Sequence, residues 1–244
     1  MKIHVINLER SADRRQHMRQ QLDGLGLDYE FFKATDASRG ELAGVSRYDE
    51  AQALWKLGHP LSPGELGCFA SHYRLWQLCA SSGEPLVIME DDISITPEFV
   101  QAFAHTGALI AQYHLIRLCG LVQRKRKRIR ELGNGHQLIR YLKGPFGTQC
   151  YALSPQGARA LLAHSQVWID AVDMVLDAFW THGLACYAIV PYHIRHDEPG
   201  VTPASLIGNS RFEQRRSLAR RLRRKLTRMG DHLQRDWFNL WHRD

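Results

Sequence analysis

Short apolar runs alternate with longer amphipathic segments along most of the chain. Runs of strand length occupy residues 2–8, 29–34, 86–89, 113–118, 148–153 and 184–190. Segments with helical spacing of apolar residues occupy 11–25, 66–79, 155–164 and 170–182, and the last of these begins at a predicted N-cap, Asp170, and ends before Gly183. Strands that alternate with helices predict an α/β fold with a mostly parallel sheet flanked by helices.

The third apolar run ends in three adjacent carboxylates, Glu90, Asp91 and Asp92. Ligands of parallel sheets bind outside the carboxyl ends of the strands, and this triplet lies at such an end. Neighbouring carboxylates repel one another, and Mg²⁺ or Mn²⁺, which prefer oxygen ligands, relieves that repulsion. We therefore expect a metal site that binds an anionic substrate such as a diphosphate. The alternative is a solvated loop before a helix that starts with Thr96 as N-cap and Pro97 as its first residue.

Length and composition describe an ordinary globular protein. A chain of 244 residues can bury the core of one domain. No apolar stretch reaches the roughly 18 residues needed to span a bilayer, and no export signal is visible, which makes the cytoplasm the expected compartment. The five cysteines form no C-x-x-C pair and are expected to be reduced and mostly buried.

The net charge of +7 is confined to the C-terminal end of the chain. Residues 211–244 contain 11 Lys or Arg and 4 Asp or Glu, whereas residues 1–210 contain 21 of each. We therefore predict a globular domain at 1–210 and a basic tail at 211–244. A body without excess positive charge argues against a nucleic-acid-binding domain.

The tail has the pattern of an amphipathic helix. Apolar residues recur every three or four positions, at Leu218, Leu222, Leu226, Met229, Leu233, Trp237 and Leu240. Basic residues crowd positions 220–225, and Trp237 and Trp241 carry side chains that favour interfaces. These features predict a helix that lies on an anionic membrane surface. The alternatives are docking on the protein's own body and formation of a homodimer.

A second basic segment, residues 123–131, interrupts the alternation of strands and helices. Its six Lys or Arg residues, Arg124 and Arg126 among them, are too charged to enter a core and predict an exposed loop or hairpin tip. Such a tip is either simply solvated or a flap that contacts an acidic acceptor or a membrane.

Four segments of the chain occur in the order found in one protein family. They are Val5–Arg15 (VINLERSADRR), Leu61–Tyr73 (LSPGELGCFASHY), Val87–Asp92 (VIMEDD) and Gly147–Leu153 (GTQCYAL). On these segments the chain resembles glycosyltransferase family 25, which contains bacterial lipooligosaccharide glycosyltransferases, often galactosyltransferases, and is similar to the collagen galactosyltransferases of animals. The resemblance covers about residues 2–210 and not the tail. It implies a GT-A (Rossmann-like) fold, a UDP-sugar donor and an inverting reaction that depends on Mn²⁺ or Mg²⁺.

The resemblance also implies which residues bind the metal. Asp92 and Glu90 are the expected carboxylate ligands, and His193 or His196 is the expected ligand from near the end of the domain. Of the two histidines, His193 fits the family pattern better, while an ordinary surface or core histidine is the alternative for either. Departing UDP develops negative charge on its β-phosphate, and a bound cation stabilises that charge.

An inverting transfer needs one carboxylate that takes the proton of the acceptor hydroxyl. Asp170, Asp173 and Asp177 are spaced to lie along one face of the predicted helix, and Asp173 matches a Val-Asp motif of the family. We expect Asp173 to be this base, with Asp170 as the second candidate. The ordinary alternatives are an N-cap role for Asp170 and a solvated side chain for Asp177.

The other candidates follow from their positions. Donor contacts are expected from residues after the first strand, after the second strand, in the second matching segment and in the triplet: Asn7, Leu8, Arg10, Arg14, Thr35, Asp36, Ser71, His72, Glu90 and Asp91. Acceptor contacts are expected from Gln149, Arg124 and Arg126. The Ser-Asp pair that the family carries farther on is absent, because Ser205 is followed by Leu206.

These expectations describe a metal-dependent, inverting transferase that moves galactose from UDP-galactose to a lipid-linked oligosaccharide at the cytoplasmic face of the inner membrane. Two alternatives are a nucleic-acid-binding protein that uses the basic segment and the tail, and a catalytically inactive, membrane-bound scaffold of the same fold. The neutral body argues against the first, and the intact Glu90-Asp91-Asp92 triplet argues against the second.

Overall fold

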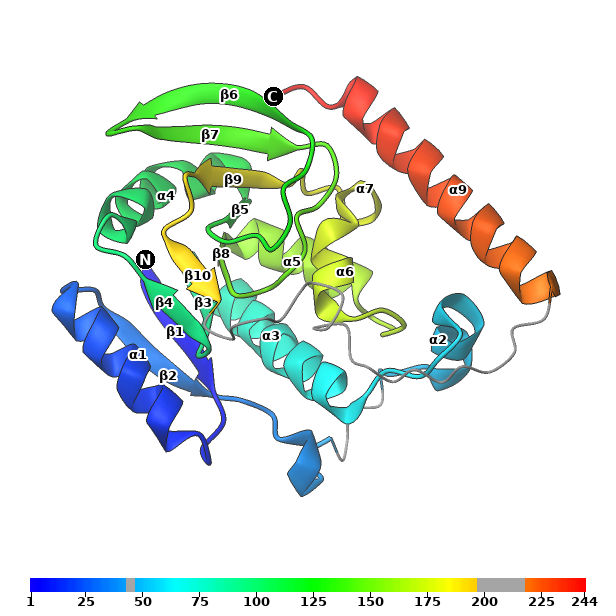
Figure 1. The fold of residues 1–244 in the computed structure, drawn as a ribbon, viewed down its shortest axis with the longest axis horizontal. Helices are drawn as coiled ribbons and strands as arrows, with labels where there is room; N and C mark the ends of the chain where they lie inside the picture. Colours follow the sequence, from blue (N-terminus) through cyan, green and yellow to red (C-terminus); the bar gives the residue numbers. More distant parts are fainter. Residues whose placement is uncertain (43–46, 197–217) are drawn as a thin grey trace.

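The computed structural model describes residues 1–42, 47–196 and 218–244, and for residues 218–228 it describes the backbone alone. The predicted domain boundary at 210, Ser205 and the first residues of the tail lie outside this description. Figure 1 shows the described elements as a central sheet with helices packed around it.

Eight strands form the central sheet in the order β2-β1-β3-β8-β5-β9-β7-β6. They are β1 Lys2–Asn7, β2 Tyr29–Lys33, β3 Leu86–Glu90, β5 Leu115–Arg117, β6 Arg126–Gly133, β7 His136–Tyr141, β8 Cys150–Leu153 and β9 Tyr187–Val190. β1 pairs in parallel with β2 and β3, and β5 with β9, whereas β7 and β8 run antiparallel to their neighbours. Six strands therefore point one way, which confirms the predicted mostly parallel α/β sheet.

Helices bury both faces of the sheet. They are α1 (Ala12–Gly24) and α4 (Phe99–Tyr113) on one face, and α3 (Pro63–Ser82) and α5 (Pro155–His164) on the other. Successive residues of β3 enter opposite cores, with Val87 and Met89 packed under α1 and α4, and Leu86 and Ile88 under α3 and α5. This two-sided burial explains why the strand is a continuous apolar run in the sequence.

The start of α3 is determined by its own sequence. The Ser62 hydroxyl accepts a hydrogen bond from the Glu65 N–H, and the Glu65 carboxylate accepts one from the Ser62 N–H, with Pro63 in the first turn. One turn later a Cβ at Gly67 would lie 2.7 Å from the Thr35 carbonyl oxygen, so only glycine permits this approach. The helix therefore packs directly against the loop after β2, at the carboxyl edge of the sheet.

Two helix predictions are wrong in detail. The segment 170–182 is not one helix, because Ala171 is the N-cap of α6 (Val172–Asp177) and Ala178 leaves the helical region at ψ 48° before α7 (Phe179–His182) begins. Gly183 ends α7 in the left-handed conformation, as predicted. Helix α4 starts after Glu98 rather than after Thr96, whose hydroxyl donates to the Glu98 carboxylate instead of capping the helix.

The basic segment is mostly exposed, as predicted, but it forms one strand of a hairpin at the edge of the sheet rather than a loop or the hairpin tip. Strand β6 pairs with β7 along its length, and the turn of the hairpin contains Asn134 and Gly135, both at positive φ. Charged side chains on an edge strand discourage pairing with other chains, which accounts for so many exposed Lys and Arg residues at this position.

Shorter elements complete the carboxyl edge of the sheet and its surroundings. They are the 3₁₀ helix η1 (Ala37–Arg39), α2 (Glu50–Leu57), and the strands β4 (Ile93–Ile95) and β10 (Ile194–His196), which form a separate two-stranded sheet. Helix α9 (Leu218–Trp241) lies along one side of the molecule and ends near β6 and β7 (Figure 1). Among the described helices, none is long and apolar enough to cross a membrane.

Candidate active site

The acidic triplet stands at the carboxyl ends of the neighbouring parallel strands β1 and β3. The Asn7 amide at the end of β1 donates to Asp91 Oδ2 at 2.6 Å and to the Ser11 carbonyl at 3.1 Å. Arg14, from the first turns of α1, lies 3.3 Å from the other oxygen of Asp91. Burial raises the pKa of Asp91, and Asn7 and Arg14 oppose this shift. The structure thus brings together three of the predicted donor-site residues, Asn7, Arg14 and Asp91, with Asp92 beside them.

Asp92 keeps one oxygen without a hydrogen-bonding partner among the described residues. Its Oδ2 lies 3.3 Å from His196 Nε2 and 3.9 Å from Arg14, whereas Oδ1 is buried and unpaired. Burial, together with the charge of Glu90, raises the pKa of Asp92 to about 6. A buried, unpaired carboxylate oxygen beside an imidazole is a donor set that fits a divalent cation such as Mn²⁺.

Glu90 points away from this opening into a hydrogen-bond network below the sheet edge. Its Oε1 accepts from the Thr148 hydroxyl and lies 3.3 Å from His72 Nε2, and the other ring nitrogen of His72 lies 2.9 Å from the Tyr151 hydroxyl. Burial alone would raise the pKa of Glu90, but His72 and Thr148 together lower it. Glu90 and His72 therefore belong to a hydrogen-bond network that supports the acidic edge. Metal binding by Glu90 stays a prediction.

Of the two candidate histidines, the structure brings His196 and not His193 to the triplet. β10 pairs with β4 so that His196 lies opposite Ile93, the residue after Asp92. The His193 ring instead contacts the Thr96 hydroxyl at 3.3 Å and His136 Nε2 at 2.9 Å. The family pattern favoured His193. The sequence does not reveal the pairing of β10 with β4 that places His196 near the triplet.

Asp173 occupies the first turn of α6. Burial and the charge of Asp177 raise its pKa to about 6, and the charge of Glu90 acts in the same direction. The backbone N–H of Met174 donates to its Oδ1 at 2.8 Å. Asp173 is therefore a partly buried carboxylate within electrostatic range of the acidic edge and with few stabilising contacts, which suits a proton acceptor.

The other two aspartates of this segment have different surroundings, and the prediction of one shared helical face is wrong for Asp170 alone, because it precedes the N-cap Ala171. Asp170 pairs with Lys56 of α2 at 2.6 Å. Asp177 is buried rather than solvated, because it accepts from Arg117 at 2.7 Å and from the Phe146 N–H at 2.9 Å. Asp170 lies before the N-cap of α6, whereas Asp173 and Asp177 lie four residues apart on the helix itself.

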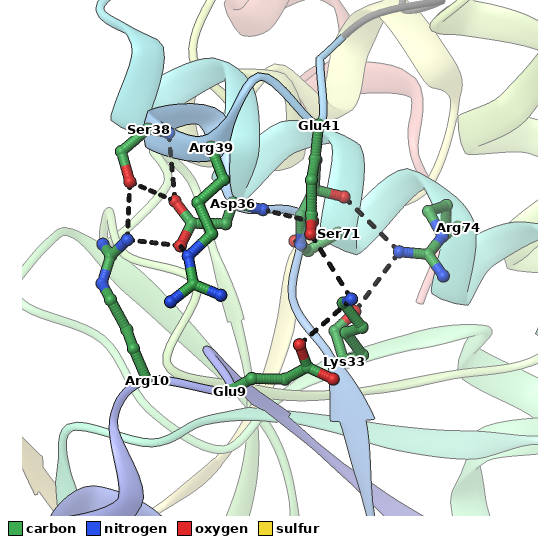
Figure 2. A network of polar contacts seen from close by, with 10 residues as sticks. Glu9, Arg10, Lys33, Asp36, Ser38, Arg39, Glu41, Ser71 and Arg74 are labelled. Atoms are coloured by element: carbon green, nitrogen blue, oxygen red, sulfur yellow. Dashed lines mark hydrogen bonds and ion pairs between the residues drawn. The ribbon is translucent and has the colours of Figure 1, made fainter.

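Figure 2 shows the polar network around the end of β2, where uridine contacts are predicted. Arg10 pairs with Asp36 and donates to Ser38 Oγ at 2.6 Å. Hydrogen bonds from Ser38, together with Arg10, lower the pKa of Asp36. The Ser71 hydroxyl accepts from the Thr35 N–H at 2.9 Å, which ties α3 to this loop. Arg10, Thr35, Asp36 and Ser71 thus form one rigid corner.

Leu8, next to this corner, is a partly buried apolar side chain packed on the core under α3.

The predicted acceptor residues do not form one group. Gln149 is buried, and its carbonyl accepts from the Glu90 N–H at 2.9 Å, so it belongs to the acidic edge. Arg124 stacks over the Phe146 ring at 5.1 Å, and Arg126 is exposed at the start of β6, opposite Tyr141. Their part in acceptor binding stays a prediction.

Sequence reasoning missed several residues of the site. Thr148 lies in one of the four segments that resemble the family, but nothing in the sequence indicates its hydrogen bond to Glu90. Arg117 is fully buried in an apolar strand, where its ion pair with Asp177 and its hydrogen bond to the Gly147 carbonyl offset the cost of burying its charge. Lys56, far away in sequence, pairs with Asp170, and both residues line a cavity of about 620 Å³ between α2, α6, α7 and α9.

Comparison with known sequences gives a family match. The sequence model of glycosyltransferase family 25 (LPS biosynthesis protein) matches residues 1–176. A "Glycosyltransferase 25 family member" of Aedes aegypti is 33% identical over 169 residues, which make up 66% of this chain and 27% of that protein. The chain therefore spans well under two thirds of the length of this relative.

Two bacterial proteins are also similar. The lipooligosaccharide biosynthesis protein lic2B of Haemophilus influenzae is 27% identical, over 66% of this chain and 62% of that protein. The lacto-N-neotetraose biosynthesis glycosyltransferase LgtE of Neisseria meningitidis is 27% identical over 95% of this chain and 87% of that protein. Among solved structures, the inositol-1-phosphate CTP transferase from T. maritima aligns at a TM-score of 0.42 and 12% identity, over 84% of this chain and 93% of that one.

Proposed function

The chain belongs to glycosyltransferase family 25, and we propose on that premise that it moves a sugar from a UDP-sugar to a saccharide of lipooligosaccharide, with inversion at the anomeric carbon. The observation that carries the proposal is the unpaired, buried oxygen of Asp92 at the carboxyl ends of β1 and β3, with Arg14 beside it. Galactose is the transferred sugar that the family resemblance favours. The names of the bacterial relatives support the acceptor class.

Asp92 and His196 are the residues that would hold Mn²⁺ or Mg²⁺, and a cation bound there would neutralise the diphosphate as it leaves. Asn7 and Arg14 hold Asp91 in place, and Arg14 adds positive charge at the same edge. The proposed contact for the uridine is the polar network at the end of β2 that includes Arg10, Asp36 and Ser38.

Asp173 is the proposed general base. At neutral pH a carboxyl with a pKa of about 6 is mostly ionised, and it is more basic than an ordinary aspartate. The acceptor hydroxyl transfers its proton to Asp173 while its oxygen attacks the anomeric carbon and the bond from the sugar to UDP breaks. No covalent intermediate is needed, because one displacement inverts the configuration.

A cavity of suitable size for the acceptor lies beside α6, the helix that carries this base. The cavity beside α6 measures about 620 Å³, and Met174, the neighbour of Asp173, lines it together with Trp180 and Asp170. An indole ring combined with charged side chains is a surface on which sugar rings stack and hydrogen-bond. We therefore assign the saccharide acceptor to this cavity rather than to Arg126 on the edge strand.

Calorimetric titration of UDP, with and without Mn²⁺, tests the donor site. We expect Mn²⁺-dependent binding to the wild type and its loss in Asp92→Ala. Asp28→Asn is the matched control, because Asp28 is an exposed carboxylate at the opposite edge of the sheet, before β2. Wild-type protein that binds no UDP under any metal condition contradicts the proposal, and salt-sensitive RNA binding would then favour the nucleic-acid alternative. Metal-dependent UDP binding without turnover would favour the inactive scaffold.

A further inference from the structure

Helix α9 exposes large apolar side chains along one face. Met229 is 53% exposed, Leu233 66%, Trp237 65%, Leu240 81% and Trp241 70%. At about 100° per residue these five positions fall within one third of the helix circumference. The two indoles lie side by side, with ring centroids 6.2 Å apart. A continuous, solvent-exposed apolar face of this kind marks an interaction site.

The helix docks on the body through a different face. Phe238 packs against Phe179, with ring centroids 5.3 Å apart. The Arg140 guanidinium donates to Asn239 Oδ1 at 2.9 Å, and the Asn239 amide donates to the Leu142 carbonyl at 3.0 Å. The docking interaction therefore satisfies the polar and aromatic side of the helix and leaves the apolar side uncovered.

The last residues of the chain lock this arrangement. Asp244 pairs with Arg140 at 2.6 Å and with Lys127 of β6 at 2.9 Å, and the Tyr187 hydroxyl lies 3.0 Å from His242 Nε2. Contacts to β6, β7 and β9 keep α9 from rotating its apolar face inward. The exposure of that face is thus a property of the docked helix and not of a detached one.

Charge identifies the occupant of the face. The helix segment 218–241 contains seven Lys or Arg and two Asp. Six of these seven basic residues lie in 218–229, which contains no acidic residue, and an anionic lipid surface attracts basic residues at about 1 kcal/mol each. Tryptophan also favours the boundary between lipid headgroups and acyl chains.

We propose that α9 binds an anionic phospholipid bilayer in the plane of its surface, with Leu233, Trp237 and Trp241 inserted at the headgroup boundary and the docked face holding the catalytic body in a fixed orientation. The cavity beside α6 is lined in part by three residues of α9, Asp231, His232 and Arg235. Membrane binding therefore places this cavity close to the bilayer, where a lipid-linked saccharide would reach it. The binding itself does not depend on the proposed transfer reaction.

Vesicle flotation of the full chain tests the proposal. The probe is a phosphatidylcholine vesicle with or without phosphatidylglycerol. We expect flotation with the anionic vesicles, and a partition coefficient lower by about tenfold or more in the variant Leu233→Ser/Trp237→Ser/Trp241→Ser. The matched control is Leu78→Ser/Val100→Ser, which removes half-exposed apolar side chains from α3 and α4 and is expected to float like the wild type.

A second variant keeps the test independent of any folding defect in the first. Replacement of Arg220, Arg221, Arg223 and Arg224 by glutamine changes the charge alone and is expected to abolish the preference for anionic vesicles. Equal flotation of all variants and the wild type overturns the proposal. A concentration-dependent dimer in sedimentation that the triple serine variant loses, without vesicle binding by the wild type, also overturns it in favour of a protein interface.

Discussion

Asp173 and Asp177 lie one helical turn apart on α6, where Asp173 is partly buried and Asp177 is buried, and their contacts differ. Asp177 is bound by the Arg117 guanidinium and the Phe146 N–H, which compensate much of its charge, although burial still raises its pKa. The described residues give Asp173 one backbone N–H and no cation in contact, and its pKa rises to about 6. The comparison teaches that the partners of a carboxylate, as well as its burial, decide between stability and reactivity.

The acidic edge repeats this difference. Glu90 is held by His72 and Thr148, while Asp92 keeps a buried oxygen unpaired. In each pair one carboxylate supports the fold and the other is available for a substrate or an ion. Changing the partners of each carboxylate tests this division.

The largest expected effect is on the reactivity of Asp173. Asp173→Asn removes the proposed base and is expected to lower kcat by about 10³-fold in a UDP-release assay with acceptor. The same variant is expected to be more stable than the wild type at pH 8, with a free energy of unfolding in urea that is higher by at most about 3 kcal/mol. The reason is that a pKa of about 6 instead of 3.8 means that ionised Asp173 destabilises the fold. Activity within a few fold of the wild type would show that another group is the base.

The next largest effect is on the stability that Asp177 provides. Arg117→Met leaves a buried carboxylate without its cation, and we expect urea unfolding to lose about 3 to 5 kcal/mol at neutral pH. Arg117→Met/Asp177→Asn is the matched control and is expected to recover part of this loss. A double variant as unstable as the single one would mean that packing, and not charge, dominates here.

Acid pH is expected to separate activity from stability. Below about pH 6 Asp173 takes up a proton, so kcat/KM should fall by about tenfold per pH unit. Between pH 6 and about 4 the folded state binds this proton while the unfolded state, with an ordinary pKa of 3.8, does not, so this group adds to the free energy of unfolding as the pH falls. pH profiles of rate and urea midpoint for the wild type and Asp173→Asn measure both trends, and identical midpoints would contradict the second.

The smallest effect is expected at Asp170. Its ion pair with Lys56 is partly exposed, so Asp170→Asn should cost about 1 kcal/mol or less in urea unfolding. Since Asp170 lines the cavity beside α6, KM for the acceptor should rise by a few fold while kcat stays close to that of the wild type. A large fall in kcat would make Asp170 the base and reverse the comparison.

Much of the fold could be predicted because its signals are local. The apolar run of residues 86–89 gave β3, and Ser62, Pro63 and Glu65 gave the start of α3. Helix α5 begins at Pro155 and ends at His164, as its spacing indicates. In contrast, α6 and α7 were joined into one helix, because the break at Ala178 has no proline or glycine to announce it.

The candidate site divides in the same way. The triplet and Asn7 could be placed at one edge because parallel strands end together. The choice between His193 and His196 could not be made, since it depends on the pairing of β10 with β4. The different partners of Asp170 and Asp177 were hidden for a related reason, because Lys56 and Arg117 come from distant segments.

The sequence by itself determined the alternation of strands and helices, the acidic motif at the end of β3 and the amphipathic pattern of the tail, since each follows from neighbours along the chain. Only the tertiary structure decided which carboxylates are paired and which are left open, and which face of α9 docks. Pairing and docking join residues far apart in sequence, and their free energies depend on burial and distance, which exist only once the chain has folded.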